Sequence, residues 1–125
     1  MWNYSQSTGV LTRNGLLISK GYSGAGRGKN NPALEAVQGV GPCPRGKWLI
    51  GKAYNSARVG PVTLPLYAMD KVVDDKHDAT GRSAFRIHGD SIKSAGNGSK
   101  GCIILPRLIR EKIANSKDKY LTVTE

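Results

Sequence analysis

The sequence has 125 residues and a mass of 13.4 kDa, which suits one compact domain over residues 1–125 and is too short for two hydrophobic cores. Sixteen glycines and six prolines indicate many turns and disfavour an all-helical fold. The formal charge of +10 attracts polyanions, and the apolar runs are far shorter than the roughly 20 residues that a transmembrane helix needs.

The first quarter of the chain alternates short apolar segments with turns. Residues 2–6, 9–13 and 16–22 are predicted strands, and Asn14-Gly15 is a strong signal for a hairpin turn. The glycine-rich segment 21–32 is predicted to be a loop, and it lacks the glycine spacing of the phosphate-binding motifs.

The middle of the chain contains further strand signals. A single helical turn is expected at Pro32–Val37 with Asn31 as its cap, followed by strands at Lys47–Ala53 and Val62–Met69. The acidic loop 70–78 lacks the spacing of a calcium-binding EF-hand and is interpreted as solvated.

The last third is expected to hold two strands, at Ala84–His88 and Gly101–Ile104, then a helix from Pro106 to about Ser116 and a final strand at Tyr120–Thr124. The apolar residues expected near one face of the helix are Leu105, Leu108, Ile109 and Ile113. The fold class predicted from these elements is mainly β, a β-sandwich or barrel-like domain with one short C-terminal helix.

The stretch GDSIKSAGNGSKGCIIL, residues 89–105, begins directly after His88. Within it, Cys102 follows a run of small residues. A cysteine nucleophile needs a nearby base and backbone N–H groups that face the developing oxyanion. His88 ends a predicted strand, and a glycine-rich loop with a returning strand would bring it near Cys102. We expect Gly101 to let substrate approach the sulfur closely. The alternative is a buried structural cysteine and a hydrogen-bonded structural histidine.

The two cysteines have no other pattern that indicates a site. Cys43 and Cys102, with two histidines, lack zinc-ligand spacing, so neither a metal nor a cofactor is predicted. A single Cys43–Cys102 disulfide, which would silence the enzyme, is compatible with an oxidising compartment.

Four blocks of the sequence together resemble a known family. GYSGAGRGKNNP, GPCPRGKWLIG, FRIHGDS and GSKGCIIL, in this order, are similar to the small L,D-transpeptidase-like antibacterial effectors of type VI secretion. The resemblance covers roughly residues 9–109. It implies an L,D-transpeptidase-like fold and a toxin that is made without a cleavable signal and secreted. The toxin would act on peptidoglycan peptide stems in the periplasm of a target bacterium. Its partners would be the type VI secretion apparatus and a cognate periplasmic immunity protein.

The resemblance implies cysteine chemistry on tetrapeptide stems. The enzyme would release D-alanine as an L,D-carboxypeptidase, or exchange it for another D-amino acid. The expected catalytic residues are Cys102 and His88. The oxyanion and supporting residues are expected to be Gly101, Ser99, Ser91 and Gly89, and the substrate-binding residues to be Tyr22, Ser23, Lys29, Asn30, Arg82, Arg86 and Lys100.

Two positions depart from the wider L,D-transpeptidase pattern. Lys100 stands where a histidine is common, and Ile104 stands where an arginine commonly contacts the substrate carboxylate. The candidates to replace that arginine are Lys100, Arg82, Arg86 and Arg107. A backbone carbonyl is expected to orient His88 in preference to the side chain of Asp90.

Two other functions explain part of the sequence. A non-catalytic basic module that binds peptidoglycan would account for the charge. A nucleic-acid-binding protein would also be basic, but only 6% of the residues are aromatic and none are interleaved with basic residues, so no nucleic-acid partner is predicted.

Overall fold

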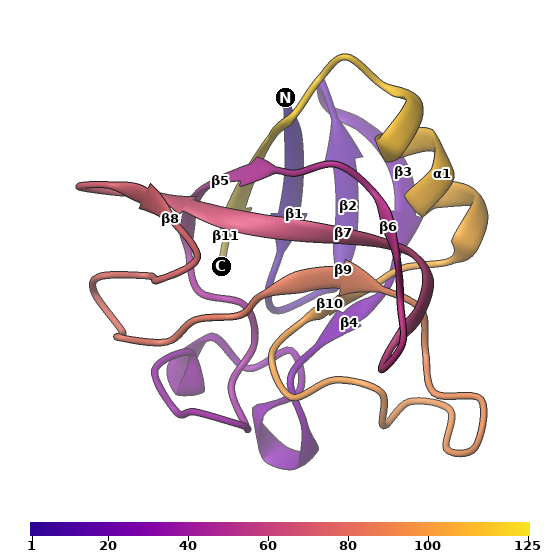
Figure 1. The fold of residues 1–125 in the computed structure, drawn as a ribbon. Coiled ribbons are helices and arrows are strands. Elements are labelled where there is room, and N and C mark those ends of the chain that lie inside the picture. Colours follow the sequence, from indigo (N-terminus) through magenta and orange to yellow (C-terminus); the bar gives the residue numbers. More distant parts are fainter.

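The computed structural model describes residues 1–125 as a curved β-sheet with one α-helix and two short 3-10 segments (Figure 1). The strands are β1 (Trp2–Ser5), β2 (Val10–Arg13), β3 (Leu16–Lys20), β4 (Tyr22–Ser23), β5 (Gly46–Ile50), β6 (Tyr54–Ser56), β7 (Gly60–Met69), β8 (Val73–Asp74), β9 (Arg86–His88), β10 (Ile103–Ile104) and β11 (Tyr120–Thr124). The helical segments are η1 (Gly26–Gly28), η2 (Pro32–Leu34) and α1 (Arg107–Asn115). The predicted mainly β fold with one short C-terminal helix is confirmed.

The strand order along the sheet is β3-β2-β1-β11-β5-β7-β9-β10-β4, and β6 and β8 pair with parts of β7. Two neighbouring pairs are parallel, β1 with β11 and β9 with β10, and the other pairs are antiparallel. The sheet is not closed, although its two end strands, β3 and β4, follow one another in the chain. Figure 1 shows β7 crossing the molecule in front of β1 and β2, with β9 and β10 below it.

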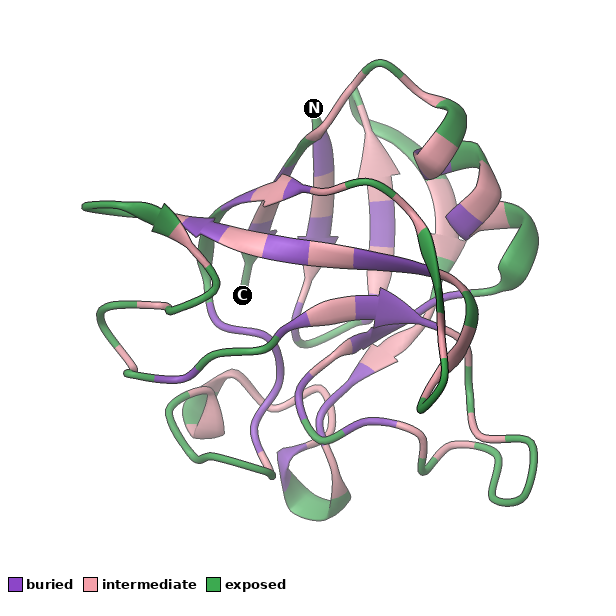
Figure 2. Ribbon diagram, in the orientation of Figure 1, coloured by how far each residue is buried: buried purple, intermediate pink, exposed green.

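One hydrophobic core fills the space between the two halves of the sheet. Side chains that alternate with exposed ones along the strands supply it, and Ile113 adds the buried side of α1. Figure 2 shows this as buried residues along β7, β9 and β1, and exposed residues in the loops. The core residues include Trp2, Tyr4, Leu11, Trp48, Leu64, Leu66, Ile87, Ile103, Leu121 and Val123.

Several local predictions are confirmed. Asn14 and Gly15 both have positive φ angles, 51° and 81°, and join β2 to β3 as a tight hairpin. The side chain of Asn31 accepts a hydrogen bond from the backbone N–H of Ala33 at 3.2 Å and so caps η2, which is shorter than the predicted turn.

Other expectations are corrected. β9 begins at Arg86, because Ala84 has a φ of 64° and leaves the extended conformation. β10 begins after Cys102, so the cysteine precedes the strand. Leu108 of α1 is 79% exposed, and Arg110 occupies the buried side of the helix beside Ile113. None of the helices has the length and apolar composition required to span a membrane.

Candidate active site

The pairing of β9 with β10 brings the two candidate catalytic residues to one side of the sheet. Ile103 pairs with Ile87 and Ile104 with His88, so Cys102 lies beside Arg86 at the start of the parallel pair. Because side chains alternate between the two faces of a strand, the burial of Ile87 and Ile103 in the core directs Cys102, Arg86 and His88 to the opposite face. The two strands run side by side in Figure 1.

The thiol of Cys102 is partly buried against the backbone that enters β9. Its Sγ lies 3.9 Å from the carbonyl oxygen of Ala84 and forms no hydrogen bond with His88. Burial raises the pKa of the Cys102 thiol above its ordinary value, while the backbone N–H of Arg86 and the guanidinium groups of Arg86 and Arg82 act to lower it. Cys102 is therefore mainly a thiol at neutral pH.

His88 is held in a defined orientation by its neighbour. Its Nδ1 lies 2.7 Å from the carbonyl oxygen of Gly89, an acceptor that selects the tautomer with the proton on Nδ1 and leaves Nε2 as the base. Burial lowers the pKa of His88, the guanidinium groups of Arg110 and Arg86 lower it further, and the Gly89 carbonyl and Asp90 act in the opposite direction. The imidazole is therefore neutral at neutral pH.

Ser99 fixes the backbone around the cysteine. Its buried hydroxyl donates to the carbonyl of Cys102 at 2.6 Å and accepts from the N–H groups of Gly101 at 3.0 Å and Gly24 at 2.9 Å. The N–H of Gly101 is therefore occupied and does not face an oxyanion. The N–H groups of Cys102 and Lys100 form no hydrogen bond within the protein.

Gly101 is required for a reason other than substrate access. It has a φ of 147°, and a Cβ at this position would lie 2.5 Å from Nη2 of Arg82 and 3.0 Å from the ring of Phe85. The space beside Gly101 is thus filled by the protein's own side chains. The expectation that Gly101 opens a path for substrate is corrected to one of close internal packing.

Two residues expected to bind substrate are in the interior. Ser23 is completely buried, and its hydroxyl donates to the carbonyl of Gly101 and accepts from the N–H of Cys43, both at 2.8 Å. Arg82 is 5% exposed and donates to backbone carbonyls. Neither side chain lines the outer surface, so both expectations are corrected. The two cysteine thiols are free, and Cys43 is buried.

The loop between β9 and Cys102 is organised by Asp90 and Tyr22. The carboxylate of Asp90 accepts from the hydroxyl of Tyr22 and from the N–H groups of Ser91 at 2.8 Å and Gly96 at 2.9 Å. The Tyr22 hydroxyl accepts in turn from the N–H of Gly98 at 2.8 Å. Burial and the hydrogen bond to Asp90 raise the pKa of Tyr22 to about 12. Asp90 thus orders the loop, and the Gly89 carbonyl orients the imidazole of His88.

The remaining predicted residues lie around this loop. The ammonium group of Lys29 lies 4.6 Å from the centre of the Tyr22 ring, and Asn30 accepts a hydrogen bond from the backbone of Ser23. Ser91 accepts from the N–H of Ser94 at 3.0 Å, within the loop and not at His88. Lys100 is exposed, two positions before the cysteine.

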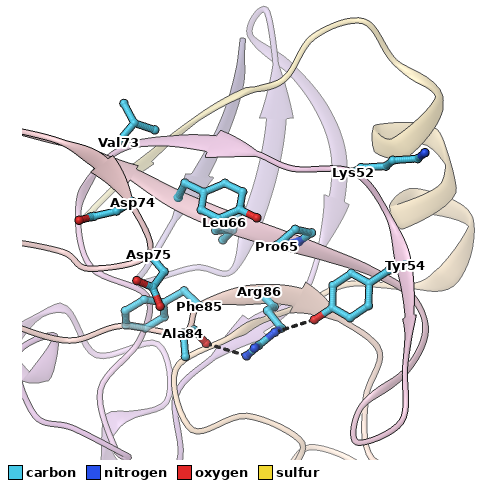
Figure 3. A pocket seen from close by; sticks show the side chains of 11 residues that line it. Lys52, Tyr54, Pro65, Leu66, Val73, Asp74, Asp75, Ala84, Phe85 and Arg86 are labelled. Atoms are coloured by element: carbon cyan, nitrogen blue, oxygen red, sulfur yellow. Dashed lines mark hydrogen bonds between the residues drawn. The ribbon is translucent and has the colours of Figure 1, made fainter.

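A cavity of about 620 Å³ is lined by Arg86, the first residue of β9, while His88 and Cys102 are not among its lining residues (Figure 3). Arg86 projects into it and donates from Nε to the hydroxyl of Tyr54 at 2.8 Å and from Nη1 to the carbonyl of Ala84 at 3.1 Å. The Nη2 group of Arg86 has no partner in the protein. The cavity is also lined by Lys52, Pro65, Leu66, Tyr67, Val73, Asp74, Asp75 and Phe85.

A protein-family model matches most of the chain. The Tlde1 domain model matches residues 18–124, which include every element from β4 to β11 and both His88 and Cys102. This chain belongs to the Tlde1 domain family. Its members are type VI secretion effectors of the antibacterial kind, so the Tlde1 assignment implies a type VI secretion apparatus and an immunity protein as partners. A search of curated proteins finds no match.

The sequence analysis missed two residues beside the site of this Tlde1 domain. Tyr54, on the short strand β6, holds Arg86, and its exposed strand carried no recognisable pattern. Arg110 donates to the carbonyls of Pro61, Val62 and Leu105, and its Nη2 packs against Gly89. The signal for Arg110 was a charge three residues before Ile113, on the buried stripe of the helix.

Proposed function

We propose that this Tlde1 domain is a cysteine-dependent, L,D-transpeptidase-like enzyme that modifies peptidoglycan in the periplasm of the target bacterium. It releases D-alanine from tetrapeptide stems or exchanges it for another D-amino acid. The observation that carries this proposal is the shared face of β9 and β10, where Cys102 directly precedes β10, His88 ends the neighbouring β9, and His88 presents Nε2 as a base. The family resemblance supplies the substrate class.

In the first step, a proton moves from the neutral thiol of Cys102 to the neutral imidazole of His88. Rotation of the Cys102 side chain away from Ala84 directs the sulfur toward His88, whose Nε2 takes the thiol proton. Contacts of this kind often tighten when substrate binds. The thiolate then attacks the carbonyl carbon at the L-centre of the diamino acid in the stem, forming a C–S bond and an oxyanion.

Backbone donors near the nucleophile stabilise that oxyanion. The N–H groups of Cys102 and Lys100 have no partner in the protein and are the donors for this role, whereas the N–H of Gly101 is bound to Ser99. Loss of one such donor typically costs several kcal/mol of transition-state stabilisation. Because Ser99 and Ser23 fix the carbonyls of Cys102 and Gly101, the loop is held in place before substrate arrives.

The acceptor decides the product. Collapse of the tetrahedral intermediate breaks the C–N bond, and the His88 imidazolium returns its proton to the departing D-alanine amine. The thioester then reacts with water, which gives trimming, or with the amine of a free D-amino acid, which gives exchange. In both cases His88 removes a proton from the acceptor, and the thiol is regenerated.

Arg86 is the substrate-carboxylate residue in this mechanism. It is the arginine beside Cys102 in the strand register, it projects into the 620 Å³ cavity, and its Nη2 is unpaired. The other arginine candidates are less suited, since Arg82 is buried and Arg107 lies on α1 within 3.9 Å of Glu111. Arg86 therefore replaces the motif arginine whose position Ile104 occupies.

The second candidate function, a non-catalytic module that binds peptidoglycan, is favoured by the formal charge of +10. It would not need a nucleophile. A module of this kind would bind sacculi and inhibit growth equally well after Cys102→Ala.

The deciding experiment is a product analysis with disaccharide tetrapeptide, with and without D-methionine, resolved by liquid chromatography and mass spectrometry. We expect the reduced protein to release D-alanine or to replace it with D-methionine. Cys102→Ala should abolish both products, because it removes the nucleophile, and His88→Ala should lower the rate at least 100-fold, the usual scale for a lost general base.

The matched control is Cys43→Ala, which removes the other thiol of the chain and leaves the proposed nucleophile in place. This variant should keep the activity of the parent protein. Product formation by folded Cys102→Ala, or none by the folded and reduced parent protein, would contradict the enzymatic proposal.

A further inference from the structure

Arg82 is a buried cation without a carboxylate partner. It is 5% exposed, and no carboxylate oxygen of an Asp or Glu side chain lies within salt-bridge distance of its guanidinium. Nearby Glu35 contributes its backbone carbonyl, while its carboxylate is bound to Arg45 and Gln6. A buried charge without a counter-ion is costly, so a position that keeps one calls for a specific explanation.

Four backbone carbonyls hold the guanidinium in one place. Nη1 donates to Glu35 at 2.6 Å and to Pro42 at 3.0 Å, and Nη2 donates to Gly41 at 3.2 Å and to Lys100 at 3.1 Å. These bonds engage the two Nη groups but supply no full negative charge. They also connect the segment after η2 to the residue two positions before the nucleophile.

The charge lies next to the nucleophile loop. Nη2 of Arg82 occupies the place where a Gly101 side chain would be, and the ring of Phe85, 4.9 Å from the guanidinium carbon, closes the other side. The charged groups that act on the Cys102 thiol are Arg86 and Arg82. The buried thiol of Cys43 also interacts electrostatically with Cys102 and Arg82. His88 stands on the neighbouring strand.

We propose that Arg82 is a positioning residue for Cys102. Its buried guanidinium fixes the Lys100–Cys102 backbone, and it supplies the permanent positive charge beside which the thiolate forms. This role explains why Arg82 has no carboxylate partner, because the Cys102 thiolate that forms during the reaction is the anion that pairs with its guanidinium. The purpose of this arrangement rests on the proposed function, but its physical test needs no peptidoglycan.

The test measures the thiolate directly. In a Cys43→Ala background, which leaves Cys102 as the single thiol, the rate of alkylation by iodoacetamide is followed by mass spectrometry from pH 6 to 11. Arg82→Gln should move the midpoint to higher pH by about one unit, so that alkylation at pH 7 is about tenfold slower. Arg82→Lys keeps the charge and should keep the midpoint close to that of the parent.

Arg27→Gln is the matched control, because it removes one positive charge from an exposed residue of η1 and should leave the midpoint unchanged. Folding of each variant is verified by circular dichroism and thermal unfolding. An unchanged midpoint in folded Arg82→Gln would overturn the proposal, as would an Arg82→Lys shift as large as that of the glutamine variant.

A second measurement leaves Arg82 in place and so avoids loss of folding. The Nε–Hε resonance of Arg82 should shift with pH at the midpoint found by alkylation, and the shift should disappear in Cys102→Ala. A resonance that does not respond to Cys102 would overturn the proposal. Loss of D-alanine release without any change in this titration would instead concern the proposed function, since alkylation requires no substrate.

Discussion

His88 is the residue whose titration sets the acid limit of the proposed reaction. Its pKa is lowered from 6.5 by burial and by the nearby guanidinium groups of Arg110 and Arg86, so protonation occurs only at a more acidic pH. The neutral imidazole accepts the thiol proton, and it is the dominant form above the lowered pKa. We predict that the acidic limb of kcat/KM has its midpoint below pH 6.5.

This limb is measured as kcat/KM for D-alanine release from disaccharide tetrapeptide between pH 4.5 and 8, because that parameter reports the free enzyme. Circular dichroism across the same range separates titration from unfolding. A midpoint at or above 6.5 in folded protein would show that His88 is more solvated or closer to a carboxylate than the structure indicates.

The two buried arginines show what residue types alone do not reveal. Because arginine is usually exposed, Arg82 was predicted to bind substrate and no role was predicted for Arg110. Their burial depends on carbonyls from segments far away in the chain, such as Gly41 for Arg82 and Pro61 for Arg110. In contrast, the His88 and Cys102 pair has local signals, since each stands next to a glycine and a predicted strand.

At the scale of elements, Ser99 connects the end of β4 to the start of β10. Its hydroxyl is buried and makes hydrogen bonds with the backbone of Gly24, Gly101 and Cys102. Ser99→Ala would leave these buried groups without a partner, which typically costs about 1–3 kcal/mol. We predict a loss of this size in the free energy of unfolding from urea denaturation, together with reduced activity.

Ser94→Ala is the control for this prediction, because Ser94 lies in the same loop but is exposed. Its free energy of unfolding should stay within about 0.5 kcal/mol of the parent value, as is usual for surface substitutions. Equal unfolding free energies for Ser99→Ala and the parent would mean that water or a shifted backbone replaces the hydroxyl.

Most strands were predicted from the sequence, including the short β9 and β10, but β6 and β8 were not. The turn signals that follow it delimited β1, and the alternation of apolar residues with threonines identified β11. β6 and β8 carry mostly exposed residues and have no apolar pattern, and they become strands by pairing with the long strand β7. Their prediction would have required knowledge of the neighbour, because strand propensity depends on context.

At the scale of the whole molecule, sheet register decides how the site is assembled. The sequence predicted a strand, a loop and a returning strand, but β9 and β10 are parallel, so the loop crosses back along the sheet before Cys102. The burial of Ile87 and Ile103 in one core fixes the register. That register places Cys102 beside Arg86, a neighbour that the order of residues along the chain did not reveal.

The net charge of the whole molecule bears on how it finds its substrate. With a formal charge of +10, the protein should be attracted to the anionic cell wall independently of Cys102. We predict that retention on purified sacculi is strong at about 0.1 M salt, where the screening length is about 10 Å, and weak at about 1 M, where it is about 3 Å. Retention is measured by co-sedimentation, and Cys102→Ala should be retained as well as the parent. Equal retention at both salt concentrations would show that binding depends on contacts in the cleft and not on the overall charge. Loss of retention in Cys102→Ala would show that the thioester itself holds the protein on the wall.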